Sequence, residues 1–244
     1  MAFHAGYDEQ TTDVYTAQFV LELTGALDVE RLHDAARQLL DRHANLRAAL
    51  RKAADGTPYQ AIVRLAETPF EICDLSAGPD PEGAATAVAV EERRRGFDLS
   101  RPPLLRWVLV RLGEDRHHLI LTNHHILLDG WSMPVLFREL LALYRRDGAA
   151  LPAVRPFGDY LSWLAEADRP AAEAAWREAL AGVEEPTLVA PGFTAAQTQV
   201  PERCEARIPE SVVAELTALA RSWGVTLNTL VQTVWGVLVG GLTG

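Results

Sequence analysis

One short stretch carries the residue types most suited to chemistry: residues 123–132 read Asn-His-His-Ile-Leu-Leu-Asp-Gly-Trp-Ser. A neutral imidazole near pH 7 accepts a proton from an attacking amine or hydroxyl, so His124 and His125 are candidate acid–base groups. Successive residues of a strand point to opposite faces, and at most one of these histidines can therefore face a given cleft. Asp129, four residues after His125, can orient an imidazole or pair with a cation. Gly130 permits a tight turn and a close approach of the backbone.

A metal site is not favoured by the remaining histidines and cysteines. A second pair, His117 and His118, adjoins a charged turn and is expected to face solvent. A strand splits each histidine pair between its two faces, and no nearby carboxylate or thiol completes a zinc ligand set. Cys73 and Cys204 are far apart in the sequence, which is typical of reduced thiols in a cytoplasmic protein.

The composition is that of a folded protein whose charge is acidic. The 244 residues include 23 Lys and Arg against 33 Asp and Glu, for a net charge of −10, and 48% are hydrophobic. This hydrophobic fraction argues against disorder, and the acidic balance argues against a nucleic-acid partner. Without a signal-peptide pattern or a long apolar run, the chain predicts no membrane segment and a cytoplasmic location.

The elements that must position the motif alternate between strands and helices. Alternation and β-branched runs predict strands at 15–23, 46–51, 59–65, 104–112 and 116–124. Apolar spacing predicts helices at 28–42, 82–95, 132–146, 157–167 and 170–180, with Asp28 and Ser132 as N-caps. Strands interleaved with helices indicate an α/β fold, and the candidate motif then follows the strand 116–124.

The last part of the chain differs from the first in composition and in the order of its predicted elements. Residues 183–200 are rich in Pro, Thr and Gln and show no period, which is typical of a linker. A strand at 202–208 and helices at 211–223 and 226–242 follow. One strand and two helices cannot form a sheet-based core alone, so we expect this part to begin a second unit.

Five segments resemble one family. The stretch 124–130 resembles the HHxxxDG motif of condensation domains from nonribosomal peptide synthetases, and Trp131 with Ser132 suits that family. Arg-His-Ala-Asn-Leu-Arg at 42–47 resembles its RHxxLR segment, with Ala44 where the family often has Glu. The other resembling segments are Arg-Gly-Phe-Asp-Leu at 95–99 with Pro-Leu-Leu-Arg at 103–106, Tyr-Leu-Ser-Trp at 160–163, and Thr-Leu-Asn-Thr-Leu at 226–230. They follow the family's order along nearly the whole chain.

The resemblance implies an α/β (α+β) fold like that of chloramphenicol acetyltransferase. Two lobes, each a mixed sheet with helices, meet in a V around a tunnel. Residues 1–185 then form the N-terminal lobe, 186–200 a linker, and 201–244 the beginning of a truncated C-terminal lobe. Because the family's first motif is matched only at its end and its later motifs are missing, we expect a portion of a larger polypeptide that is inactive alone.

The implied reaction is amide formation between two thioesters, each tethered to the phosphopantetheine of a carrier protein. The site residues carried over are His125 as the central group, either a general base or a positioning group, together with His124, Asp129 and Gly130. Structural support is expected from Arg42, Arg47, Trp131 and Ser132, with Asp129 paired to one of the two arginines. Trp131 also has a reading as a core residue.

The implied partners are acyl or peptidyl carrier domains on both sides and an adjacent adenylation domain. No cofactor or metal is expected to bind the chain directly. Other readings stay open at this point: a non-catalytic carrier-binding module of the same fold, an epimerization domain, or a free-standing acyltransferase with an HxxxD signature. His125 and Asp129 satisfy that last pattern as well.

Overall fold

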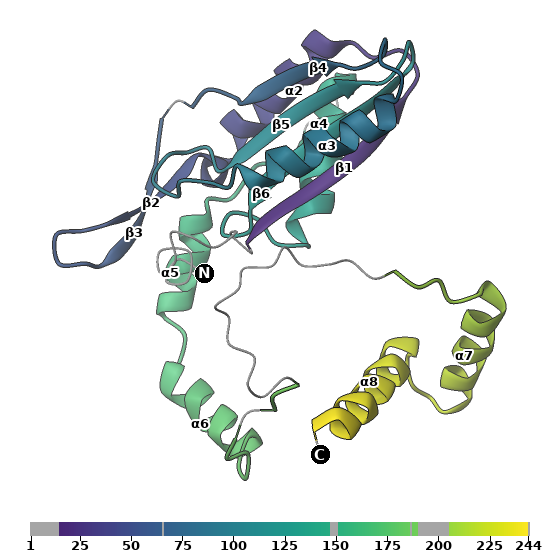
Figure 1. Ribbon diagram of the computed structural model, residues 1–244. Helices are drawn as coiled ribbons and strands as arrows, with labels where there is room; N and C mark the ends of the chain where they lie inside the picture. The colour runs from purple at the N-terminus through teal and green to yellow at the C-terminus, as the bar shows by residue number, and fades with distance from the viewer. Residues whose placement is uncertain (1–14, 65, 147–150, 186, 190–204, 244) are drawn as a thin grey trace. The chain divides into compact units, whose positions relative to one another are not determined.

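The computed structural model describes residues 15–64, 66–146, 151–185, 187–189 and 205–243 (Figure 1). The chain divides into two compact units, Met1–Ala167 and Asp168–Gly244, and each is described by itself. The first unit holds the sheet and the candidate motif. The lobe boundary at residue 185 and the linker over 186–200 stay predictions, because most of that linker lies outside the described residues.

A four-stranded mixed sheet forms the centre of the first unit. Its strands, in order across the sheet, are β1 (Thr16–Thr24), β6 (Arg116–His124), β5 (Leu105–Arg111) and β4 (Phe70–Asp74). β1, β6 and β5 pair antiparallel, whereas β4 pairs parallel with β5. His124 lies opposite Thr16 in the register, so the motif leaves the sheet beside the start of β1. The mixed sheet with its helices confirms the predicted α/β class.

Helices cover both faces of this sheet. α2 (Val29–Arg42) and α4 (Ser132–Arg145) share one hydrophobic core with Trp107 and Leu109 of β5. α3 (Pro81–Arg94) lies on the opposite face in Figure 1, where it packs with the alternate β5 residues Val108 and Val110. This division follows from the two-residue side-chain period of a strand.

The sequence pattern of α2 explains its place in the core. Asp28 caps the helix as predicted, since its Oδ1 accepts a 3.0 Å bond from the N–H of Arg31. The apolar stripe of the helix is buried: Leu32, Ala36, Leu39 and Leu40 are each at most 3% exposed, whereas His43, which continues the stripe, is only partly buried. The end of α2 is therefore fixed against the sheet, and the segment resembling RHxxLR begins there.

A β-hairpin follows α2 and projects from the sheet (Figure 1). It consists of a 3₁₀ turn, η1 (Ala44–Arg47), then β2 (Ala48–Lys52) and β3 (Pro58–Ile62). Gly56 has a φ of +83°, which glycine adopts without strain, and it lies in the turn between the two strands. The backbone N–H of Leu50 also bonds the Leu99 carbonyl at 2.8 Å, which ties β2 to the loop before β5.

Three sequence predictions need correction. The strand β4 is absent from the predicted elements, because Phe70 and Cys73 pack into different cores while Ile72 is 60% exposed, so no regular alternation is visible. His117 does not face solvent: it is 5% exposed, since the strand turns it inward. The described residues 205–208 form no strand, as expected for a segment without a paired strand beside it.

The remaining described helices follow the sheet in the sequence. They are α5 (Phe157–Ala165), α6 (Arg169–Ala179), α7 (Glu210–Ser222) and α8 (Leu227–Thr243), all close to their predicted spans. Thr226 caps α8, because its Oγ1 accepts a 3.1 Å bond from the N–H of Thr229.

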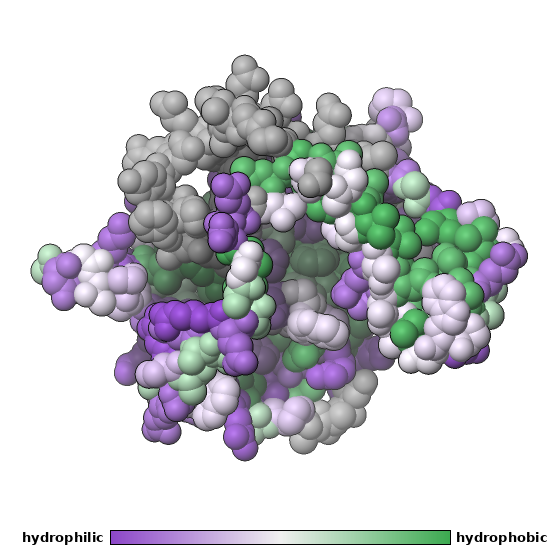
Figure 2. Space-filling model, turned by 90° about the horizontal axis from the view of Figure 1, so that it is seen from below, coloured by the Kyte–Doolittle hydropathy of each residue, from purple (hydrophilic) through white to green (hydrophobic). Residues whose placement is uncertain are grey.

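The helix α8 is rich in apolar residues, with polar side chains such as Asn228 and Gln232 along one stripe, and none of its side chains is buried. In Figure 2, hydrophobic residues, coloured green, gather mainly in the upper and right-hand parts of the view. Apolar surface of this kind marks a packing or interaction face. No single described helix is long and apolar enough to span a membrane; only α7 and α8 taken together, with a 100° bend between them, meet that length and composition test.

Candidate functional site

The site begins where β6 ends, at His124. This side chain is fully buried and lies between the rings of Tyr15 and Phe97, with centroid distances of 6.0 and 6.4 Å. Its Nδ1 accepts a 3.0 Å bond from the N–H of Ile126, which places the proton of the neutral ring on Nε2. His124 thus has a fixed tautomer and a fixed orientation inside the core.

His125 is the first residue beyond the strand, and its environment differs from that of His124. Its backbone N–H donates to the carbonyl of Tyr15 at 2.8 Å, and its side chain is only partly buried. Among the described residues, its Nδ1 has no hydrogen-bond partner although that atom is shielded from solvent. The imidazole of His125 therefore keeps its hydrogen-bonding capacity, whereas the ring of His124 packs in the interior.

Asp129 connects the motif to the start of α4. Its Oδ1 accepts bonds from the hydroxyl of Ser132 at 2.7 Å and from the N–H of Ser132 at 2.9 Å. These bonds, the hydroxyl's first, hold the pKa of the Asp129 carboxyl below its usual value. The prediction of Ser132 as the N-cap is wrong: Ser132 is the first helical residue and acts as a donor, because the longer Asp129 side chain reaches both of its groups.

The predicted pairing of Asp129 with Arg42 or Arg47 does not occur within the described residues. Arg42 is directed to Glu139 of α4, with 2.8 Å between Nε and Oε2, and it also bonds the carbonyl of Pro152. Arg47 donates to the carbonyls of Leu40 and Asp41 at 2.7 and 2.6 Å. The last carbonyls of a helix lack partners within it, and these two α2 carbonyls therefore attract the guanidinium.

Sequence reasoning missed Glu139, which is 4% exposed and lies inside the core between α2 and α4. His43 also reaches this carboxylate, with 2.6 Å from Nε2 to Oε2. Burial alone would raise the pKa of Glu139, but the hydrogen bonds from Arg42 and His43 outweigh it and lower the pKa. A detectable signal existed: Glu139 stands on the apolar stripe of its helix, three residues after Leu136 and one before Leu140.

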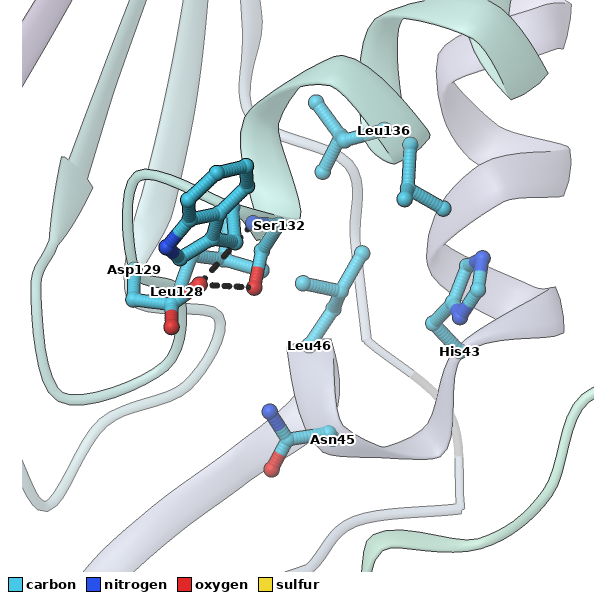
Figure 3. Close-up of a pocket in the computed structure, with 9 residues that line it drawn as sticks. His43, Asn45, Leu46, Leu128, Asp129, Ser132 and Leu136 are labelled. Carbon is cyan, nitrogen blue, oxygen red and sulfur yellow. Dashed lines mark hydrogen bonds between the residues drawn. The ribbon is translucent and has the colours of Figure 1, made fainter. Parts of the chain in front are cut away.

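A pocket of about 420 Å³ adjoins the motif at Asp129 (Figure 3). Asp129 and Ser132 form one side of it, and His43 and Asn45, at the end of α2 and in η1, face them in the close-up. Leu46, Leu128, Val135 and Leu136 supply its apolar lining. The pocket combines a few fixed polar groups with an apolar wall, as small-molecule sites do. His125 is not among its lining residues.

Two further predicted residues have clear positions. Trp131 lines the pocket but is 87% exposed, which rules out its reading as a core residue in this unit. A Cβ added at Gly130 would meet no described atom within 4 Å, so the protein itself does not crowd this glycine.

Within the described ranges, no group of three or more His, Cys, Asp or Glu side chains is arranged to hold a metal ion.

Comparison with known proteins shows the family of the chain. The family model "Condensation domain" matches residues 1–244, and the chain therefore belongs to the condensation-domain family. The chain is 38% identical to a linear gramicidin synthase from Brevibacillus parabrevis over 259 residues, covering 100% of this chain and 3% of that synthase. It is 32% identical to bacitracin synthase 3 of Bacillus licheniformis, covering 98% of this chain and 4% of that synthase.

A solved structure supports the fold assignment. The first condensation domain of the calcium-dependent antibiotic synthetase, in complex with a substrate analogue, superposes with a TM-score of 0.75 at 27% identity. The match covers 94% of this chain and 56% of that chain. The chain thus spans little more than half of the solved domain and only a few per cent of the synthases.

Proposed function

We propose that this chain is the N-terminal portion of a condensation domain that forms an amide bond between two carrier-bound thioesters. The observation that carries the proposal is the stretch His124–Gly130 at the end of β6, in a chain that matches the condensation-domain family over its whole length. A match to the condensation family, with the gramicidin and bacitracin synthases as relatives, favours this reaction over epimerization.

In the proposed reaction, the amine of the acceptor aminoacyl thioester attacks the thioester carbonyl of the donor acyl or peptidyl group. The new C–N bond forms, the C–S bond breaks, and the pantetheine thiolate leaves. His125 takes the amine proton, which then passes to the thiolate, or it aligns the amine for attack. A free α-amino group has a pKa of about 8, so modest assistance from an imidazole suffices. Alignment of two tethered substrates supplies much of the remaining rate.

The other site residues act around His125 in this proposal. His124 fixes the end of β6 through its bond to Ile126, and Asp129 fixes the start of α4 through Ser132. Gly130 leaves room for substrate to approach the backbone, since nothing in the described chain fills the place of its missing side chain. Arg42 supports the arrangement through Glu139.

The proposal extends to organisation and partners. Residues 1–185 belong to the first lobe, 186–200 to a linker and 201–244 to the beginning of the second lobe. Carrier domains on either side present the substrates on phosphopantetheine, and an adenylation domain loads the acceptor carrier in the cytoplasm. The support is that the relatives are synthases far longer than this chain.

The test is reconstitution of the complete domain with a loaded donor carrier and a loaded acceptor carrier, with products followed by mass spectrometry. Condensation predicts an amide whose mass equals both acyl groups combined, carried on the acceptor. Exchange of the donor α-hydrogen in heavy water without a joined product would instead identify an epimerase. Carrier binding without either product would identify a non-catalytic module.

A further inference from the structure

Asn45 joins two segments that are far apart in the sequence. It lies in η1, and its Nδ2 donates to the carbonyl oxygen of Leu127 in the motif loop at 2.9 Å. Its Oδ1 accepts a 3.1 Å bond from Nε2 of Gln60 on β3. One side-chain amide therefore connects the β2–β3 hairpin to the loop that follows His125.

The chemistry of the partners fixes the direction of both bonds. The carbonyl of Leu127 can only accept, so the NH₂ group of Asn45 must face it. The remaining oxygen of Asn45 then faces Gln60, which must present its own NH₂ group. Aspartate has the same shape but no donor, and it would oppose an oxygen to the Leu127 carbonyl.

The loop is bonded at both of its ends. At the first end, the N–H of Ile126 donates to Nδ1 of His124 at 3.0 Å, and the N–H of Leu127 donates to the His124 carbonyl at 3.1 Å. At the other end, Asp129 bonds to Ser132. The middle of the loop, at the carbonyl of Leu127, is connected by Asn45 to the α2–β2 segment.

We propose that Asn45 is a positioning residue for the condensation reaction, holding the turn that orients His125. The RHxxLR pattern leaves position 45 open, so the amide is a feature of this chain and not of the motif. The role rests on the proposed function, since it concerns how accurately the imidazole of His125 is held. A displacement of about 1 Å in a reacting group lowers a rate by about 100-fold.

The experiment compares Asn45→Asp with the wild-type complete domain in the loaded-carrier assay. The variant keeps the acceptor for Gln60 and removes the donor to Leu127. We expect kcat to fall by about 10- to 100-fold while KM for both carriers is unchanged, because Asn45 acts on the position of His125 and not on carrier binding. The charge-matched control is Arg94→Gln on α3, which lowers the net charge by one as Asn45→Asp does; the Arg94 side chain is 63% exposed, and this variant should retain the wild-type kcat.

Hydrogen–deuterium exchange of the peptide covering 124–131 gives a second readout that needs no activity. Asn45→Asp should speed exchange there, and Arg94→Gln should not. Wild-type kcat together with wild-type exchange in Asn45→Asp would overturn the proposal. A fall in kcat that comes with a raised KM for the carriers and a lowered melting temperature would overturn it as well. If Asn45→Asp fails to fold, Asn45→Ala meets the same criteria. A wild-type domain that makes no amide would refute the proposed function, while the exchange result would still decide whether Asn45 holds the loop.

Discussion

The carboxylate of Glu139 in α4 lies 2.8 Å from Nε of Arg42 at the end of α2, and 5% of the Glu139 side chain is exposed. His43 bonds the same oxygen at 2.6 Å. This buried cluster connects the two helices α2 and α4. Both helices flank the pocket, because Ser132 at the start of α4 and Asn45 just after α2 line it. The motif loop therefore depends on a pair of helices whose register is set by charge as well as by apolar packing.

Glu139→Gln should destabilise the first unit. The substitution keeps the shape but removes the charge that Arg42 and His43 face, and hydrogen bonds to charged groups contribute roughly 1.5–3 kcal/mol. We expect the free energy of unfolding in urea to fall by about that amount. The control is Glu91→Gln on α3, whose side chain is 73% exposed and 3.9 Å from Arg94, and which should change stability by less than about 0.5 kcal/mol. Equal losses in the two variants would contradict the importance of the cluster.

His117 should make stability depend on pH. Burial, followed by the charge of Arg111, holds its pKa below the ordinary 6.5. The unfolded chain then binds a proton more readily, so stability that is present above pH 6.5 is lost as the pH falls toward the folded pKa. We expect His117→Leu to lose less stability than the wild type between about pH 7.5 and pH 5.5 in urea titrations. Parallel losses in both proteins would contradict the assignment.

Asp129 should contribute to structure separately from any role in chemistry. Its side chain accepts two bonds from Ser132 at the start of α4, as an N-cap does. Asp129→Ala should therefore lower the melting temperature, whereas Asp129→Asn retains an acceptor and should melt close to the wild type. If Asp129→Asn also loses amide formation while its melt is retained, the negative charge matters for the reaction. A melt of Asp129→Ala identical to the wild type would show that these two bonds are unimportant for stability.

Much of the first unit follows from local sequence rules. The capped stripe of α2, the Asp55-Gly56 hairpin turn and the paired strands before His125 are all set by short-range patterns. The strand β4 lacks such a pattern, because its parallel pairing to β5 involves residues distant in the sequence. The prediction for His117 is wrong because a charged turn beside it suggested exposure, while the strand period decides its burial.

In the candidate site, too, some residues could be identified from local sequence patterns and others could not. The histidine pair, Asp129 and Gly130 are contiguous and could be identified from sequence spacing. Glu139 and Asn45 act through distant partners, at sequence separations of 97 and 82 from Arg42 and Leu127. No local rule predicts such contacts, and the expected partner of Asp129 is wrong for this reason. Only the packing of α2 against α4 reveals that Arg42 forms its ion pair with Glu139.

The most direct test of the proposed function is the rate of amide formation by the complete domain, measured for the wild type and His125→Ala with both carriers loaded. A melting curve of each protein accompanies the rates. We predict that His125→Ala lowers kcat by about 100- to 10,000-fold, the range for a lost acid–base group, while its melting temperature stays near that of the wild type. Full activity in His125→Ala would contradict a role for this imidazole in the reaction.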